Sequence, residues 1–421
     1  MIQSIYAGVS GLQSFQTGID VLANNIANVN TVGFKGSTAE FSNLFSQAVN
    51  TSGNAVTSMQ TGLGVQVNAS NLDLSEGSYY QSGNTTDLAI VGDDGWFGLT
   101  GPNEEEFFSR AGNFRFDPYS ADGIQTDLRL INPEGYLLTG TLADNTNGGV
   151  LSPVVESLEL ADVNSQEALS FPSELAFPLQ PTTQADFIGN IGVENLPKVV
   201  SATVISPQGE RNSLRLAFTQ AATQPATGIR WDVTATTQTA DGLTVYDTQT
   251  GVVDFDGGGS LISSTLGTID NNGAPVTANL GTGLNGIISN SGPTLTTSGT
   301  ADGILAGDLV DYSVNRNGEV ISNFTNGKQS IVGKVAIYHF QNDQGLEAIS
   351  GNRFRASDNS GEPIFYAQEN GSLLSGTLEN SNVTLETALT ELIIMQRSYD
   401  ATAKTISTSD QMLQNALQMG R

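Results

Sequence analysis

The sequence predicts a mainly β protein with long terminal α-helices, in which the N- and C-terminal helices form a coiled-coil-like core domain beside two nested β-domains. Apolar residues recur every seven positions at both ends of the 421-residue chain, as in helices that pack along other helices. Between these ends, 47 glycines and a charged fraction of only 14% accompany short alternating apolar runs bounded by turn residues. This combination is typical of turn-rich β-domains.

The N-terminal heptad pattern predicts a helix over about residues 3–28, roughly 39 Å long at about 1.5 Å per residue. Three glycines inside it, Gly8, Gly11 and Gly18, each lower helix stability by about 1 kcal/mol relative to alanine. We therefore expect this helix to order only on packing with partners. The alternative is an amphipathic helix docked on its own domain. The apolar positions are Ile5, Leu12, Ile19 and Ile26, with Leu22 between two of them.

The C-terminal residues repeat the pattern and predict a second helix over about residues 382–417. Asn382 or Thr384 can cap its start, and Glu386 lies where a negative charge interacts favourably with the helix dipole. Two such helices at opposite ends of one chain predict that the ends meet. The heptad positions are Leu385, Leu392, Tyr399, Ile406 and Leu413.

An asparagine-rich segment follows the first helix. Asparagine side chains compete for backbone hydrogen bonds and suit helix ends and turns. Asn24 and Asn28 lie one turn apart, where polar groups in a packed seam can fix register. Gly33 can adopt a positive φ, after which Phe34 becomes a fixed apolar anchor. The alternative is an ordinary C-cap followed by a loop, although this segment, which includes Asn25, has more asparagines than capping needs.

The composition argues against several functions. A net charge of −27 opposes nucleic-acid binding. No window has the roughly 18 consecutive apolar residues of a membrane helix. The first residues lack the basic start and apolar run of a signal peptide. With no cysteine and one histidine, His339, the usual zinc ligands are missing. The G-x-G-x-x-G run at 281–286 follows no clear strand and opens no helix, so we expect no dinucleotide cofactor. Asp254, Asp256 and Asp93-Asp94 lack the spacing of a calcium loop. We expect no cofactor, metal site or catalytic residue.

Three motifs resemble those of the bacterial flagellar rod and hook proteins. The N-terminal motif is Leu22-Ala-Asn-Asn-Ile-Ala-Asn-Val-Asn-Thr-Val-Gly-Phe-Lys35. The C-terminal motif comprises Leu378-Glu-Asn-Ser-Asn-Val383, Ile394-Met-Gln-Arg-Ser-Tyr399 and Ala403-Lys-Thr-Ile406. The segment Phe108-Ser-Arg-Ala-Gly-Asn-Phe114 resembles the β-domain next to the helices in this family.

The strand pattern and the resemblance together predict three nested parts, with residues 36–71 as an extended linker. A proline-rich passage begins the part that is inserted between the two halves of the first β-domain. Rod proteins of the family lack a comparable insertion, which favours a hook protein. The predicted parts are residues 1–71 with 367–421 for the helical core (assembly) domain and linker, 72–145 with 301–366 for the first β-domain, and 146–300 for the inserted outer β-domain.

The resemblance implies a structural, non-enzymatic subunit of the flagellar hook that polymerises into a curved tubular universal joint and transmits motor torque to the filament. It implies as partners further copies of this chain in a helical homopolymer, other axial proteins (rod, hook cap and hook–filament junction proteins) and the flagellar export apparatus. The location implied is the hook/basal body of the bacterial flagellum, extracellular after flagellar type III export. A distal rod protein and a secreted β-rich adhesin are the alternatives. The residues expected at the assembly interface are Ile5, Leu12, Ile19, Leu22, Asn24, Asn25, Ile26, Asn28, Gly33, Phe34, Leu385, Leu392, Tyr399, Ile406 and Leu413.

Overall fold

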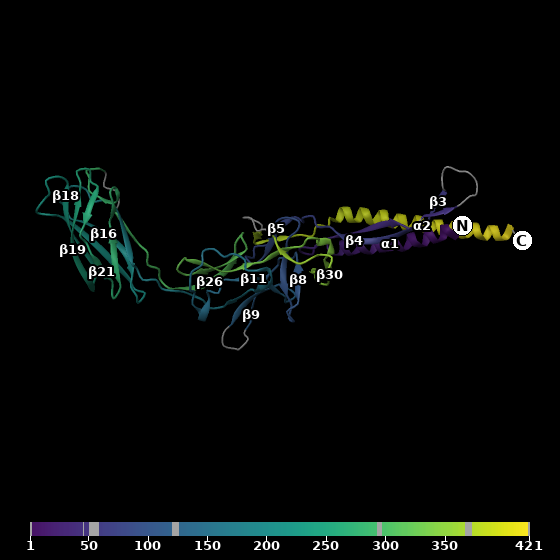
Figure 1. Cartoon of the computed structure of the whole chain (residues 1–421), viewed down its shortest axis with the longest axis horizontal. Coiled ribbons are helices and arrows are strands. Elements are labelled where there is room, and N and C mark those ends of the chain that lie inside the picture. Colours follow the sequence, from purple (N-terminus) through teal and green to yellow (C-terminus); the bar gives the residue numbers. More distant parts are fainter. Residues whose placement is uncertain are drawn as a thin grey trace.

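The computed structural model describes residues 2–44, 46–49, 59–119, 126–292, 297–366 and 373–419. The chain is elongated, with both termini at one end, a middle β-domain, and an outer β-domain at the other end (Figure 1). Helix α1 (Ile2–Ala27) and helix α2 (Leu385–Met419) lie along each other at the terminal end. The predicted fold class and the meeting of the two chain ends are confirmed.

A long hairpin lies along α1, where the sequence predicted an extended linker. Strand β1 (Ser37–Asn43) pairs antiparallel with β4 (Val65–Leu72), and β2 (Ser46–Val49) pairs with β3 (Met59–Gly62). Along β4, half-buried residues alternate with exposed ones, as in a strand with one face against α1. The linker prediction is wrong because a high content of Ser, Thr and Asn hid this period-2 pattern.

The middle domain contains one branched sheet of 15 strands, paired antiparallel throughout. Its main path runs β14 (Ala176–Phe177), β26 (Gly307–Val314), β27 (Glu319–Phe324), β28 (Gln329–Val335), β11 (Leu137–Leu142), β7 (Trp96–Thr100), β8 (Glu106–Ser109), β31 (Arg353–Arg355) and β30 (Glu347–Ile349). The branches are β9 (Arg115–Tyr119), β10 (Asp127–Ile131), β12 (Glu167–Ala168), β13 (Ser170–Pro172), β29 (Ile337–His339) and β32 (Ile364–Phe365).

Two short strand pairs attach the chain entering and leaving the helices to this domain. Strand β5 (Tyr79–Gln81) pairs with β34 (Thr377–Glu379), and β6 (Leu88–Ile90) pairs with β33 (Leu373–Ser375). Residues 373–379 therefore belong to the middle domain, whereas the sequence assigned them to the helical core domain. The described residues also include three short 3-10 helices, at Asn147–Gly149, Val163–Ser165 and Asp343–Gly345.

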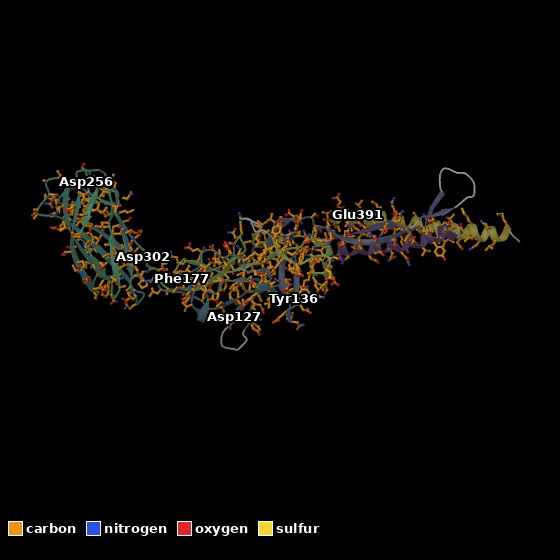
Figure 2. The ribbon with its side chains drawn as sticks, in the orientation of Figure 1. Asp127, Tyr136, Phe177, Asp256, Asp302 and Glu391 are labelled. Carbon is orange, nitrogen blue, oxygen red and sulfur yellow. The ribbon has the colours of Figure 1, made fainter. Side chains whose placement is uncertain are left out.

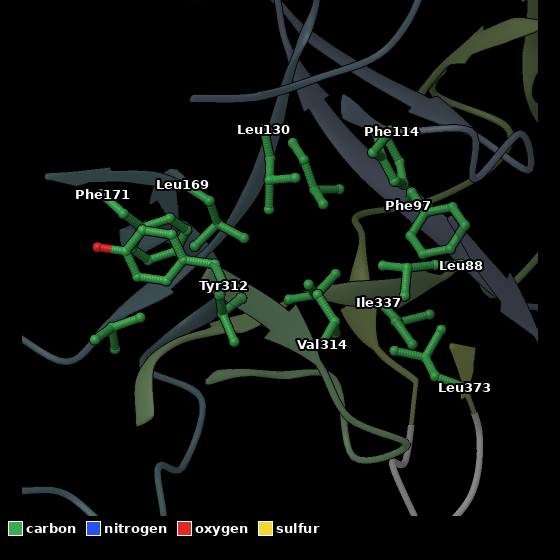
Figure 3. Packing of buried hydrophobic residues seen from close by; sticks show 14 of the residues in the cluster. Leu88, Phe97, Phe114, Leu130, Leu169, Phe171, Tyr312, Val314, Ile337 and Leu373 are labelled. Atoms are coloured by element: carbon green, nitrogen blue, oxygen red, sulfur yellow. The ribbon is translucent and has the colours of Figure 1, made fainter. Parts of the chain in front are cut away.

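The core of the middle domain joins segments that are far apart in the sequence. Leu88, Phe97 and Phe114 from the first half of the chain pack near Ile337 and Leu373 from the second half (Figure 3). The rings of Phe97 and Phe114 meet edge to face, with centroids 5.1 Å apart. This mixture of early and late segments is what a nested order of domains requires.

The outer domain begins later than the sequence predicted. Leu151, Leu169, Phe171, Leu175 and Phe177 are buried in the core of the middle domain, and strands β12–β14 pair within its sheet. The predicted boundary at residue 146 followed a change to proline-rich composition. It was wrong because these segments of unusual composition still bury their apolar side chains against the middle sheet.

The outer domain packs two sheets around its own core, which includes Phe187, Phe218, Trp231 and Phe255. The first sheet is an antiparallel meander of β16 (Lys198–Ile205), β17 (Arg211–Gln220), β18 (Ile229–Thr239), β19 (Val245–Phe255) and β20 (Leu261–Ser264). The second contains β21 (Thr268–Asp270), β22 (Pro275–Asn279), β15 (Gln184–Asn190), β24 (Asn285–Ile288), β23 (Gly281–Thr282) and β25 (Ser298–Ala301).

Two neighbouring segments form the neck between the β-domains. Gln180 and Ile304 exchange two backbone hydrogen bonds of 2.9 and 2.8 Å, which forms a single antiparallel bridge. On the outer side, the Asp302 carboxylate accepts hydrogen bonds from the backbone N–H groups of Thr183 (2.9 Å) and Gln184 (3.1 Å). Asp302 lies where the outer domain begins and Phe177 at the adjoining end of the middle domain (Figure 2).

Candidate functional site at the junction of the terminal helices and the middle domain

Small residues of α1 face α2. A Cβ atom added to Gly8 would lie 2.6 Å from Cγ1 of Ile406, and one added to Gly11 would lie 3.1 Å from Cγ2 of Thr402. A Cβ at Gly18 would lie 3.5 Å from the methyl group of Met395. The glycines therefore form hollows that receive side chains of α2. The sequence indicated only that these glycines lower helix stability, and it did not indicate this packing role.

The predicted heptad positions are only partly those that the two helices bury. On α2, Leu392, Tyr399, Ile406 and Leu413 are half-buried, whereas Leu385 is 49% exposed and Ala388 is the buried residue of the first turn. On α1, Leu22 is buried, and Ile5, Leu12, Ile19 and Ile26 are half-buried. The buried stripe of α1 begins with small residues (Gly8, Gly11, Ser14 and Gly18), which hydrophobicity alone does not reveal.

The asparagine-rich segment terminates α1 through local hydrogen bonds. The amide of Asn25 donates to the carbonyl of Ser37 (2.7 Å) and accepts from its N–H (3.0 Å), which attaches β1 to the helix. Asn28 donates to the backbone carbonyl of Asn24 (2.9 Å), and its own side-chain oxygen accepts from the hydroxyl of Thr31 (3.1 Å). Asn24 is exposed and makes no hydrogen bond to α2 among the described contacts, so register fixing within this helix pair is not its role.

The expected positive φ of Gly33 is present. Its φ is +61°, and a Cβ there would lie 2.7 Å from the backbone nitrogen of Ala111. The N–H of Gly33 donates to the carbonyl of Glu379 over 2.8 Å. Phe34 follows and is half-buried, and its carbonyl accepts from the N–H of Asn382. Gly33 thus brings the N-terminal motif against both the middle domain and the C-terminal motif.

Of the two residues that could cap the start of α2, Thr384 and Asn382, only Thr384 lies at the helix end. Thr384 immediately precedes the helix, and its carbonyl accepts the N–H of Ala388 (3.0 Å). Asn382 instead joins other segments, because its side-chain oxygen accepts from Gly36 N–H (2.8 Å) and its amide donates to the carbonyl of Asp73 (2.8 Å). The cap assignment to Asn382 is therefore wrong.

A buried charged cluster joins the three segments that carry the motifs. One carboxylate oxygen of Glu379 lies 2.9 Å from Nζ of Lys35, and the other lies 2.6 Å from Nε of Arg110. All three side chains are almost completely shielded from solvent. We refer to Lys35, Arg110 and Glu379 as the junction cluster.

Backbone groups complete the hydrogen bonds of the junction cluster. Arg110 donates to the carbonyls of Ile90 (3.0 Å), Gly92 and Gly95 (2.5 Å). Lys35 donates to the carbonyl of Ser75 (2.7 Å) and to that of the preceding residue, and Glu379 accepts from the N–H of Gly77 (2.8 Å). Buried charges persist in a protein only when they are paired and hydrogen-bonded in this way.

The cluster shifts the pKa values of its members. Burial raises the pKa of Glu379, but the positive charges of Arg110 and Lys35 outweigh it, so that the pKa of this carboxyl lies below its usual value. Burial lowers the pKa of Lys35, and repulsion from Arg110 lowers it further, against the attraction of Glu379. The cluster therefore holds two cations around one strongly ionised carboxylate.

The sequence motifs included the three residues of the junction cluster but gave no indication that they meet. One signal was available for Lys35, because it is the only basic residue in the first 71 positions. A lone basic residue in a segment with only two acidic ones favours a specific partner. No comparable signal identified Arg110 or Glu379, since the middle of the chain has many charged residues.

Other candidate sites from the sequence have structural explanations. The glycine motif at 281–286 forms a hairpin in which Gly281 pairs with Gly286, and no helix follows. The carboxylate of Asp254 binds Arg230 through two hydrogen bonds of 2.6 and 2.9 Å. Asp256 caps its own turn by accepting from two backbone N–H groups, at 2.8 Å each.

His339 is half-buried on β29, with its ring 6.2 Å from that of Tyr366. Within the ranges that the structure describes, no three acidic or histidine side chains converge in a metal-like group. The described helices include none that is long and apolar enough to span a membrane.

The terminal motifs match two protein-family models. Residues 5–35 match the family described as flagella basal body rod protein, and residues 374–419 match the flagellar basal body rod FlgEFG protein C-terminal family. These ranges contain α1, α2, Lys35 and Glu379, which are the elements that the junction brings together.

Curated relatives match over nearly the whole length. The flagellar hook protein FlgE of Escherichia coli (strain K12) is 30% identical, with 96% of this chain and 97% of the relative covered. The flagellar hook protein FlgE of Treponema pallidum (strain Nichols) is 28% identical over the full length of both chains. The crystal structure of the Helicobacter pylori flagellar hook protein FlgE2 shares the fold, with a TM-score of 0.52 and 16% identity over 72% of this chain and 99% of that chain. The chain therefore belongs to the flagellar hook protein (FlgE) family.

Proposed function

We propose that copies of this chain polymerise through their paired terminal helices into the curved tube of the flagellar hook, which transmits torque from the motor to the filament. The chain is a structural hook protein by its family. The tube, its curvature and the use of the terminal helices as the assembly surface are the steps that the geometry supports and that experiment must test.

The observation that carries the proposal is the apolar surface that the helix pair leaves uncovered. On α2, Leu385, Leu389, Ile393 and Ile394 are between 42% and 58% exposed, and on α1 Tyr6 is 69% exposed. The first three of these lie at intervals of four residues, so they form one stripe along α2. Full burial of an exposed side chain of this size contributes about 1.5–3 kcal/mol, and neighbouring copies in a polymer can supply the part that these partly exposed side chains still lack.

The distribution of charge fits the same arrangement. Charged residues are few near the chain ends, and most of the net charge of −27 lies in the β-domains. Helices with little charge can pack closely with many identical neighbours, whereas acidic outer parts repel one another and remain soluble. A firm helical core with weaker outer contacts is what a bending, rotating joint requires.

Family membership supports the remaining partners that we propose. A hook subunit adjoins other axial proteins, namely rod, hook cap and hook–filament junction proteins, and we propose that this chain contacts them through the same terminal helices. We further propose that the flagellar export apparatus secretes it to the outside of the cell. Nucleic acid and enzyme substrates are not among the partners that we propose.

A distal rod protein and a secreted adhesin were the alternatives from the sequence. The curated relatives are hook proteins that match this chain at nearly equal length, inserted domain included, so neither alternative is favoured.

Electron microscopy of the purified protein tests the proposal. We expect curved tubes under assembly conditions, and hydrogen exchange that slows in α1 and α2 on polymerisation while the β-domains change little. If the chain stays monomeric under all assembly conditions, or forms only straight and rigid tubes, the proposed hook assembly is wrong. Strong protection of both helices in dilute monomer would contradict their ordering on assembly.

A further inference from the structure

A groove with mixed polar and apolar walls lies between the end of α1 and the middle domain. It has a volume of about 500 Å³ and is lined by residues of the N-terminal segment and of the middle domain. Its walls include the side chains of Asn28, Asn113, Asn132, Glu134 and Arg353. Lys35 of the junction cluster also lines this groove, but it already has its full set of acceptors.

Arg353 is the unusual member of this wall. Only 8% of its surface is exposed, and its guanidinium lies 3.9 Å from the ring centre of Tyr136 and 5.1 Å from that of Phe107. These two rings hold the cation in place. Its position therefore depends on packing as well as on charge.

The ion pair of Arg353 leaves much of its hydrogen-bonding capacity unused. Its Nε lies 3.0 Å from a carboxylate oxygen of Glu134, but the N–H direction does not point at an acceptor, so that this buried nitrogen lacks a hydrogen bond. The terminal guanidinium nitrogens also make no hydrogen bond to any residue that the structure describes. Glu134 is itself 39% exposed on the turn between β10 and β11. A guanidinium has five donors in a planar fork, and it binds carboxylates most strongly in the bidentate mode.

The groove adds further donors beside Arg353. The side-chain oxygen of Asn132 accepts hydrogen bonds from the N–H groups of Glu134 (3.1 Å) and Tyr136 (2.8 Å), which fixes the orientation of the amide. The amide nitrogen of Asn132 has no partner among the described residues. Asn113 likewise has no described side-chain hydrogen bond and lines the same groove. A cation with neighbouring amide donors recognises a carboxylate, not a cation or an apolar group.

We propose that this groove is a contact between subunits, in which Arg353 binds an acidic side chain of a second copy of the chain. The second copy is the occupant favoured by charge, because each chain has 43 acidic and 16 basic residues, so carboxylates of neighbours outnumber the cations available to them. Glu134 occupies part of the guanidinium in the isolated chain. This inference rests on the proposed polymerisation.

Assembly of charge-neutral variants tests the contact. We expect Arg353→Gln to raise the critical concentration for assembly by roughly tenfold or more, because a bidentate charged hydrogen bond is lost. Glu134→Gln should leave the critical concentration within about twofold of the value for the unaltered chain, since a half-exposed ion pair contributes little. Arg355→Gln is the matched control, because Arg355 is an exposed arginine two residues away on the same strand. If Arg353 serves only its own chain, the variants at 353 and 134 will instead lower monomer stability together and leave assembly of the folded chains unchanged.

Zero-length crosslinking identifies the occupant directly. In the double variant Arg353→Lys with Glu134→Gln, carbodiimide should join the new amine at position 353 to a carboxylate of another copy in polymers but not in dilute monomers. Mass spectrometry of the linked peptides gives the residue, with Arg355→Lys in the Glu134→Gln background as the control. If position 353 forms no intermolecular link while the polymer is intact, the inference is wrong and the proposed function stands. If the unaltered chain forms no polymer at all, the proposed function itself fails.

Discussion

Nζ of Lys35 lies 2.9 Å from the carboxylate of Glu379, although 344 positions separate the two residues in the sequence. Arg110 binds the other oxygen of the same carboxylate over 2.6 Å. The segment that follows α1, the middle domain and the segment that precedes α2 are therefore joined at one point. A force that acts on the terminal helices reaches the middle domain through this buried contact.

Loss of the Glu379 charge should weaken the junction strongly. Glu379→Gln keeps the shape of the side chain but leaves Lys35 and Arg110 as buried like charges, which we expect to lower the free energy of unfolding by about 3–5 kcal/mol. Urea unfolding followed by fluorescence of Trp96, which is buried in the middle domain, measures this change. Glu347→Gln, on an exposed strand position, is the control. Equal midpoints for both variants would show that the cluster contributes little.

The effect of Glu379→Gln should depend on pH in a defined direction. The folded-state pKa of Glu379 lies below the ordinary value of 4.5, so its ionised form contributes stability that is fully present above 4.5. That contribution is lost as the pH falls through the lower, folded-state pKa. We expect the difference between the native chain and Glu379→Gln to be constant near neutral pH and to shrink in acid. A difference that grows below pH 4.5 would contradict the assigned sign.

Added bulk at Gly8 should weaken assembly even though alanine is a better helix former. Gly8→Ala gains about 1 kcal/mol in helix propensity, but its Cβ would overlap Ile406, and overpacking costs typically 1–3 kcal/mol. We expect a higher critical concentration for Gly8→Ala and partial recovery when Ile406→Ala is added. Gln16→Ala, on an exposed position of α1, controls for propensity alone. Tighter assembly of Gly8→Ala would show that the glycine only weakens the helix.

A charge in the seam of the helix pair should block assembly without unfolding the β-domains. Leu392→Asp and Ile19→Asp each place a carboxylate at a half-buried position between or beside the helices, where an unpaired charge is costly. Sedimentation of polymer and tryptophan fluorescence report the two effects separately. Gln396→Asp adds the same charge at an exposed position of α2. Normal polymers from Leu392→Asp would remove this residue from the assembly surface.

The two β-domains should unfold as separate units. Each contains one of the two tryptophans, Trp96 in the middle domain and Trp231 in the outer domain, and both are buried. Trp96→Phe and Trp231→Phe therefore leave a reporter for one domain only. We expect removal of residues 181–303, with a short glycine–serine connection, to leave the Trp96 transition within about 1 kcal/mol, because the two cores do not share residues. Loss of that transition would mean that the domains depend on each other.

Periodic and local features of this fold could be predicted from the sequence. The bounds of α1 differ by one residue from the prediction, because a run of heptads defines a helix over its whole length. The positive φ of Gly33 was also expected, since glycine adopts this conformation without the steric cost of a Cβ atom. Both properties belong to single segments.

Features that depend on distant segments could not be predicted. The sequence shows the start of a strand pattern at 62–67, but the pairing of β1 with β4 was missed because these strands are rich in Ser, Thr and Asn and pack one face against α1. Strands β12–β14 were assigned to the wrong domain, since their partners lie elsewhere in the chain. Leu385 follows the heptad spacing but is exposed at the first position of α2, which the spacing alone does not show.

The bridge between Gln180 and Ile304 places the first and last residues of the outer domain next to each other. The domain is thus a cassette with adjacent ends, and the middle sheet would close identically around a longer, shorter or different insert. In the assembly that we propose, this insert can change while the terminal helices that carry the contacts remain the same. For engineering, the same position offers a site for grafting a foreign β-domain onto the proposed tube.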